Sequence, residues 1–243
     1  MKYSIKDINK VHKTARNWLD SFLLDPVISI FFWITANFTS LTPNAVTIIS
    51  LGLYIACGLL FLNGNLLLGG IAFYLGVLGD AIDGNLARLK FKPTKFGAWL
   101  DTWVDTVGQA IAAITLGYGY YLYTQNEIWL LLGGVMLFIK FHHNLESNTA
   151  LKLMGDKRYK ARVSEGNEGQ DGIIGRIRKY LLKKRLRDPV SGSDIKTLFF
   201  VIGPIFKILD IILLIVIPIF IIKEVIWFIY YKRELQLLDK QQE

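Results

Sequence analysis

Residues 80–105 read DAIDGNLARLKFKPTKFGAWLDTWVD and contain four aspartates at short, regular spacings. Asp80 and Asp83 are three residues apart, so on a helix they share one face. Asp101 and Asp105 are four apart and share a face of the next helix. Each pair lies at one end of an apolar run, where carboxylates need compensating partners. A hairpin of the two helices would gather four carboxylates, and such oxygen ligands suit Mg²⁺, Mn²⁺ or Ca²⁺.

The composition indicates a membrane protein. Of 243 residues, 52% are hydrophobic and the mean hydropathy is +0.37, which is too apolar for an ordinary soluble domain. The net charge of +8 favours anionic lipid, or charged loops that set the orientation in a membrane, over nucleic acid. Cys57 is the only cysteine, so an intramolecular disulfide is excluded. We therefore expect an all-α polytopic membrane protein.

Apolar runs predict six transmembrane helices after an N-terminal part, residues 1–40, made of amphipathic and interfacial helices. The apolar stretch at 26–38 is shorter than the roughly 20 residues of a span, so we expect it to lie on the membrane surface. A membrane domain at 41–231 would contain a basic insertion at 151–193, with an amphipathic helix at 173–187, and would be followed by a tail at 232–243. The predicted spans are 43–62, 66–86, 97–123, 128–150, 194–206 and 210–231.

The distribution of Lys and Arg predicts the orientation of these spans. The turns at 63–65 and 124–127 contain neither residue type, whereas the connection at 88–95 and the insertion at 151–193 are rich in both. Basic loops remain on the cytoplasmic side of a membrane. We therefore expect a multi-pass integral membrane protein whose four aspartates face the cytoplasm.

The spacing D-x2-D-G-x2-A-R-x8-G-x3-D-x3-D resembles the signature of the CDP-alcohol phosphotransferase family. The resemblance extends over about residues 41–231. It implies transfer of a phospho-alcohol group, such as a phosphatidyl group, from a CDP-alcohol to a second alcohol, with release of CMP, in phospholipid biosynthesis. The signature positions here are Asp80, Asp83, Gly84, Ala87, Arg88, Gly97, Asp101 and Asp105.

The resemblance also implies roles for the aspartates. Asp80, Asp83 and Asp101 would be metal ligands for Mg²⁺ or Mn²⁺, with paired sites for two ions. Asp105 would be the general base and would share in metal binding. The acceptor hydroxyl would then attack the β-phosphorus by direct displacement.

The other signature residues are expected at the nucleotide. Gly84 allows close approach of a ligand to the backbone, and Arg88 can make a forked contact to phosphate. Ala87 and Gly97 complete this group by resemblance. Asn44 and Thr47 lie in a T-P-N-x2-T stretch that also resembles the family, so they are candidates for the same site.

The acceptor site is assigned to four further residues. Lys140 and His143 lie in a basic cluster that could bind a phosphorylated acceptor, such as inositol phosphate or glycerol phosphate. Ser193 and Lys196 begin a helix that resembles the polar start of the fifth helix in lipid-forming members of the family. The resemblance also makes a homodimer through small-residue helices possible.

Two other interpretations remain open at this point. A soluble donor, such as CDP-choline or CDP-ethanolamine, could instead transfer its group to diacylglycerol. In a different class, the four aspartates could bind ions in a cation transporter, because intramembrane acids often mark ion paths.

Overall fold

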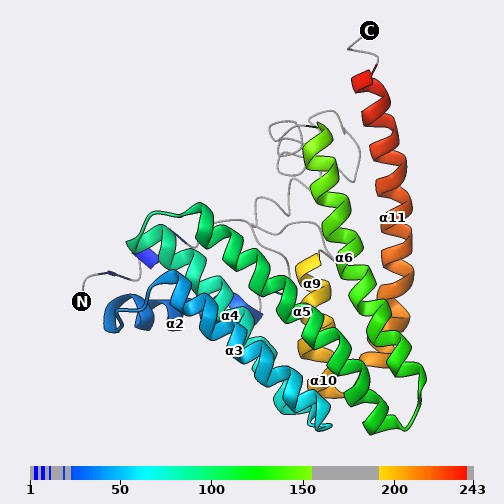
Figure 1. The fold of residues 1–243 in the computed structure, drawn as a ribbon, viewed down its shortest axis with the longest axis horizontal. Helices are drawn as coiled ribbons and strands as arrows, with labels where there is room; N and C mark the ends of the chain where they lie inside the picture. The colour runs from blue at the N-terminus through cyan, green and yellow to red at the C-terminus, as the bar shows by residue number, and fades with distance from the viewer. Residues whose placement is uncertain are drawn as a thin grey trace.

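The computed structural model describes residues 3, 4, 7, 8, 11, 19, 23–154 and 192–239, and the regular structure of these residues is helical throughout. Four helices form its first part: α2 (Asp25–Phe38), α3 (Pro43–Leu62), α4 (Leu66–Lys90) and α5 (Lys95–Thr124). The helix predicted at 26–38 and the four predicted spans up to residue 150 are each confirmed as helices. Figure 1 shows α2 to α5 as one packed group.

Local sequence explains where these helices begin. Thr42 caps α3 by accepting a hydrogen bond from the Ala45 amide, and Pro43 occupies the first turn, where its missing N–H costs nothing. Thr94 caps α5 in the same way through the Gly97 amide. Both caps lie at the end of the bundle that carries the signature residues, so they fix the backbone there.

Two boundaries differ from the prediction because helices continue further than the apolar runs. The α4 helix extends to Lys90, so the connection predicted at 88–95 shortens to residues 91–94 and Arg88 is helical. Long Lys and Arg side chains can end an intramembrane helix while reaching water. Helix α11 (Leu209–Asp239) likewise continues through most of the tail predicted at 232–243. The helix predicted at 173–187 lies outside the described residues.

Glycine brings α3, α4 and α5 into close contact. A side chain on Gly76 of α4 or Gly108 of α5 would overlap the ring of Tyr54 from α3. A Cβ on Gly117 would come within 2.7 Å of the backbone carbonyl of Trp129, at the contact with the next helix. Small residues on 97–123 therefore permit close helix approach, as expected from the sequence.

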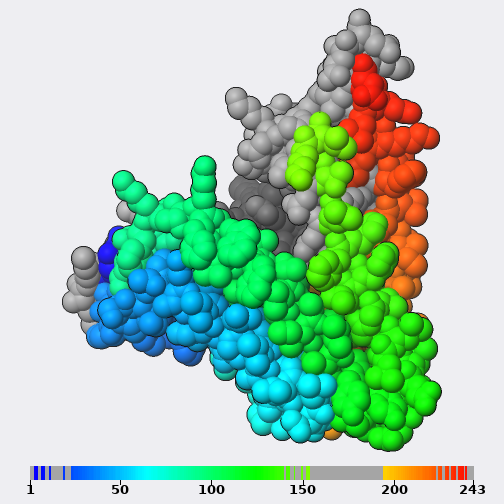
Figure 2. Space-filling view, in the orientation of Figure 1, coloured from blue at the N-terminus to red at the C-terminus, as the bar shows by residue number. Residues whose placement is uncertain are grey.

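The remaining helices form a second part. Helices α6 (Ile128–Met154) and α11 lie side by side, and their ends near residues 154 and 239 extend beyond the α2–α5 group (Figures 1 and 2). Between them in sequence come α9 (Gly192–Thr197), the π-helix η2 (Leu198–Ile202) and α10 (Gly203–Phe206). Of these short helices, η2 and α10 pack against α4, and α9 packs against η2.

The chain breaks between α10 and α11, as the sequence predicted for 204–209. Lys207 adopts a left-handed conformation, with φ of 56°. The Tyr120 hydroxyl fixes the break because it donates to the Gly203 carbonyl at 2.8 Å and accepts from the Leu209 amide at 3.1 Å. A helix on the other side of the bundle thus satisfies backbone groups that the break exposes.

Two described helices, Pro43–Leu62 and Leu66–Lys90, are long and apolar enough to cross a membrane. Shorter apolar helices occur at Asp25–Phe38, Ile128–Ile139 and Leu209–Ile222. Many large apolar side chains on α3 and α11 are exposed, including Ile48 and Leu214, which suits contact with lipid. The count of six spans stays a prediction.

Candidate active site

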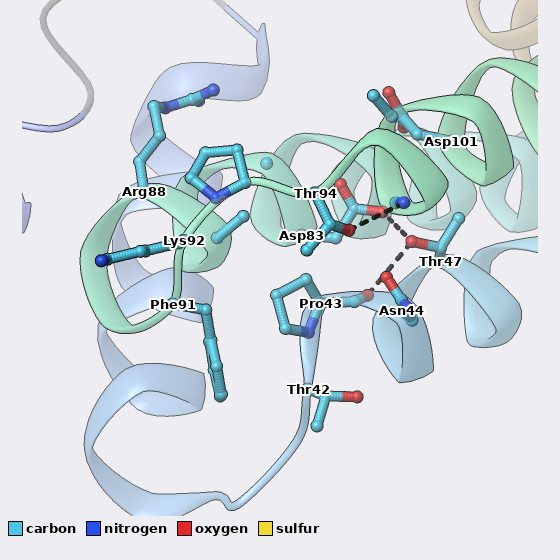
Figure 3. A pocket seen from close by; sticks show the side chains of 15 residues that line it. Thr42, Pro43, Asn44, Thr47, Asp83, Arg88, Phe91, Lys92, Thr94 and Asp101 are labelled. Atoms are coloured by element: carbon cyan, nitrogen blue, oxygen red, sulfur yellow. Dashed lines mark hydrogen bonds between the residues drawn. The ribbon is translucent and has the colours of Figure 1, made fainter.

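A cavity of about 420 Å³ opens where the start of α3, the end of α4 and the start of α5 meet. Figure 3 shows side chains from all three helices and from the connection at 91–94 around it. The lining includes every residue predicted to bind nucleotide, together with two of the aspartates. These predicted residues are Asn44, Thr47, Asp83, Gly84, Ala87, Arg88, Gly97 and Asp101.

Asp83 is held at the wall of this cavity by α3. The Thr47 hydroxyl donates to its Oδ2 at 2.5 Å, a contact drawn in Figure 3. The Asp83 side chain is 4% exposed, so this bond orients a carboxylate that water barely reaches. Thr47 therefore has a defined task, which is to fix the position of one acidic oxygen.

The two signature glycines leave room for a ligand in different ways. A Cβ at Gly84 would meet only the Arg88 guanidinium, at 3.6 Å, so the α4 backbone is accessible there. A Cβ at Gly97 would come within 3.0 Å of Thr94 Oγ1 and 3.2 Å of Asn44 Oδ1. Gly97 thus keeps the α5 cap close to α3, and Gly84 offers open backbone.

Basic side chains occupy the mouth of the cavity. Arg88 donates from Nη2 to Asn85 Oδ1 at 2.8 Å, and Asn85 is fully buried. This bond anchors one edge of the guanidinium on α4. Lys92 is exposed on the connection between α4 and α5. Two cations therefore lie beside an accessible stretch of backbone, an arrangement that suits an anionic phosphate.

The other two aspartates lie further along the helices, outside the cavity lining. The carboxyl group of Asp80 lies close enough to Asp101, Asp105 and Lys196 for their charges to act on it. Lys196 Nζ contacts Asp105 Oδ1 at 3.1 Å, and Lys196 is only 7% exposed. The helix hairpin thus brings the four acids to one end of the bundle, with a buried cation from α9 against Asp105.

The donor set fits a hard divalent cation in chemistry, since all four groups offer carboxylate oxygens. Within the described residues, however, no group of three or more His, Cys, Asp or Glu side chains is close enough to hold a metal ion as it stands. Metal binding at this end would therefore require the carboxylates to adjust, and it stays a prediction.

A family model described as CDP-alcohol phosphatidyltransferase matches residues 40–153. This segment is a CDP-alcohol phosphatidyltransferase domain. It contains the whole signature and the helices that form the cavity. Together with the two long apolar helices, this match indicates a membrane protein.

Two relatives of the transferase domain are named as synthases of inositol phosphate lipids. The chain is 32% identical over 97 residues to an archaetidylinositol phosphate synthase of Pyrococcus horikoshii, covering 40% of this chain and 52% of that protein. It is 39% identical over 84 residues to a phosphatidylinositol phosphate synthase of Corynebacterium glutamicum, covering 32% of this chain and 38% of that protein. The matches thus span about half the length of these relatives or less.

A solved structure is also similar to the chain. It is the phosphatidylinositol phosphate synthase of Mycobacterium tuberculosis with CDP-DAG bound, with a TM-score of 0.38 and 24% identity. The match covers 62% of this chain and 67% of that one.

The structure places one of the four residues predicted to bind the acceptor. Lys196 contacts Asp105 of the transferase domain. Lys140 and His143 lie on α6 and Ser193 on α9, but the positions of their side chains are outside what the structure describes. Their assignment stays a prediction.

Sequence reasoning missed several buried polar residues of the transferase domain, among them Tyr54, Asn85 and Gln109. Asn85 anchors Arg88, and the Gln109 amide donates to the Asp105 carbonyl at 3.0 Å. Asn85 lies inside the signature stretch at a position that the signature leaves open, so its burial could not be read from the motif. Tyr54 and Gln109 lie outside the stretch, and only the packing of α3 against α4 and α5 reveals them.

Proposed function

We propose that this protein transfers a phospho-alcohol group from a CDP-alcohol to a second alcohol and releases CMP. The observation that carries the proposal is the cavity, because it gathers the predicted nucleotide residues and two signature aspartates from three helices. The match of residues 40–153 to the family model supports the same reaction class.

The nucleotide diphosphate would lie along the end of α4. Gly84 offers backbone without a side chain, and Arg88 and Lys92 supply positive charge beside it. Arg88 suits this role because its planar fork can bind two phosphate oxygens, and its bond to Asn85 holds it in place. Asn44, Thr47, Ala87 and Gly97 would complete the nucleotide site.

Asp80, Asp83, Asp101 and Asp105 would hold Mg²⁺ or Mn²⁺, as a pair of ions. When bound, divalent ions neutralise the pyrophosphate and act as Lewis acids toward the reacting phosphorus. Two features support metal binding here: Thr47 holds the Asp83 carboxylate, and Asp101 lies near Asp80.

Asp105 would act as the general base. The acceptor hydroxyl oxygen forms a bond to the β-phosphorus, the bond from that phosphorus to the bridging oxygen breaks, and CMP leaves with its electron pair. The hydroxyl proton passes to the Asp105 carboxylate. Lys196 keeps Asp105 oriented before the acceptor arrives, since it contacts one of its oxygens.

For the substrates, we favour a CDP-linked lipid, CDP-diacylglycerol or an archaeal equivalent, with a phosphorylated acceptor such as inositol phosphate. The names of the two relatives support this choice. A buried lysine beside the base is suited to a phosphate on the acceptor, with Ser193, Lys140 and His143 as further candidates. A soluble CDP-alcohol acting on diacylglycerol is the second arrangement.

The membrane arrangement is part of the proposal. Six spans with the cavity on the cytoplasmic side would give a lipid donor access from the bilayer and the soluble acceptor access from water. The basic connection at 91–94 supports this orientation, because its lysine lies at the mouth of the cavity. A homodimer in the membrane fits the same scheme.

The test uses the purified full chain in detergent or liposomes. Labelled CDP-diacylglycerol and CDP-choline are offered separately, each with inositol phosphate, glycerol phosphate, inositol or diacylglycerol, and CMP and lipid products are measured. We expect CMP release with CDP-diacylglycerol and inositol phosphate. Absence of CMP with every combination of donor and acceptor would contradict the reaction class. Transport of cations across the liposome membrane would favour the cation transporter.

A further inference from the structure

Tyr54 is a fully enclosed polar side chain near the aspartates. It is fully buried, and its ring fits between Gly76 of α4 and Gly108 of α5. A side chain at either glycine would overlap the ring. Gly76 lies one helical turn before Asp80, and Gly108 lies about one turn after Asp105. The helices that carry the acids thus enclose this ring.

Among the described residues, the Tyr54 hydroxyl has no hydrogen-bond partner, although it is buried. The charges of all four aspartates act on it, those of Asp80 and Asp105 most strongly. A phenylalanine would fill the same space without burying a hydroxyl, and an unpaired buried hydroxyl is unfavourable for folding. The hydroxyl therefore calls for an explanation beyond packing.

We propose that Tyr54 is a positioning residue for the aspartate cluster, and that its hydroxyl donates to the Asp80 carboxylate when the cluster holds divalent cations. The proposal rests on the proposed function. A carboxylate that binds a metal through one oxygen needs a fixed second oxygen, and a hydrogen bond from behind supplies this. Two glycines keep Tyr54 in one place, so it can orient Asp80 without rearranging itself.

The location of Tyr54 suits a donor of this kind. A tyrosine hydroxyl has one hydrogen to give, and carboxylates are acceptors when ionised. Asp83 already has a hydroxyl donor in Thr47, and Asp105 has Lys196. Tyr54 would give Asp80 the corresponding donor, so that three of the four acids would each have a partner from another helix.

The test compares two substitutions that each remove one buried tyrosine hydroxyl. Tyr54→Phe keeps the ring between the glycines, and Tyr120→Phe removes a hydroxyl with two backbone partners far from the acids. For each purified full-length variant, the melting temperature is measured in EDTA, and Mn²⁺ affinity is measured by titration with detection of free Mn²⁺ by electron paramagnetic resonance.

We expect Tyr54→Phe to melt in EDTA at the same temperature as the unchanged protein or higher, and to bind Mn²⁺ about 10- to 100-fold more weakly, the usual effect of losing a hydrogen bond to a metal ligand. Tyr120→Phe should melt lower and bind Mn²⁺ with unchanged affinity.

Two results would overturn the inference while the proposed function stands: unchanged Mn²⁺ affinity in Tyr54→Phe, or a lower melting temperature of that variant in EDTA. A lower melting temperature would mean that the hydroxyl makes a stabilising hydrogen bond within the protein. Gln109 Oε1 is a candidate acceptor, since it is another buried atom without a partner among the described residues. If the unchanged protein bound no Mn²⁺, both the inference and the metal-dependent function would fail.

Discussion

Two buried tyrosines, Tyr54 on α3 and Tyr120 on α5, differ in how their hydroxyl groups are satisfied. Tyr120, near the break before α11, has a hydroxyl with two backbone partners. Tyr54, near the aspartates, has a hydroxyl with none. At the break before α11 the chain itself satisfies the tyrosine hydroxyl, as in a structural region. In our proposal the hydroxyl near the aspartates serves ligand binding, so the comparison separates a contribution to stability from a contribution to function.

The largest expected effect is at the acid end. Asp105→Asn removes the proposed base while keeping the size of the side chain, so we expect turnover to fall about 10²- to 10⁴-fold, with CDP-alcohol binding largely retained. CMP release and nucleotide binding measure the two quantities. Asp210→Asn, an exposed acid at the start of α11, is the matched control and should have normal activity. Near-normal turnover in Asp105→Asn would refute the assignment.

Lys196→Met should have the next largest effect. It removes the cation that contacts Asp105 and, in our proposal, binds the acceptor phosphate. Loss of one charge-assisted hydrogen bond predicts a rise of about 10- to 100-fold in KM for a phosphorylated acceptor. Steady-state kinetics with each substrate varied in turn provide the measurement. If KM for the CDP-alcohol rose instead, Lys196 would belong to the donor site.

Gly108→Ala tests the packing that encloses Tyr54. The added methyl group would overlap the Tyr54 ring, which Gly76 confines on its other side, so we expect destabilisation of about 1–3 kcal/mol. Gly52→Ala is the control, because no atom lies within 4 Å of a Cβ there. Thermal or denaturant unfolding in detergent compares the two variants. Equal stability would mean that the tyrosine ring is not confined.

Tyr120→Phe should have the smallest effect and should be confined to stability. The loss of its hydroxyl leaves the Leu209 amide without that acceptor, which predicts a cost of about 1–2 kcal/mol. The melting temperature should fall while the CMP release rate at 25 °C stays unchanged. A large loss of activity would remove the distinction between the two ends of the bundle.

Much of this fold could be predicted from sequence because its signals are local. Apolar runs gave the positions of α3, α4 and α5, and the signature spacing indicated the residues that meet at the cavity. Gly203 and Pro204 with the nearby charges located the break before α11. These features depend on neighbours within a few turns.

The features that sequence could not predict join helices that are distant along the chain. Lys196 meets Asp105 across 91 positions, and Tyr120 reaches Gly203 across 83. Which face of α3 turns toward α4 and α5 decides that Tyr54 is buried, and an apolar helix without clear amphipathicity does not reveal its inner face. The ends of α4 and α11 were missed because helices can continue into charged sequence.

In our proposal, the acidic end of the bundle is a metal-dependent transferase site. Its most direct test is CMP release from labelled CDP-diacylglycerol, with inositol phosphate as acceptor, by the purified full chain in Mn²⁺ or Mg²⁺ and in excess EDTA. We predict release that requires the divalent ion and stops in EDTA. Full activity in EDTA, or no CMP in either condition with any CDP-alcohol and acceptor, would contradict the account.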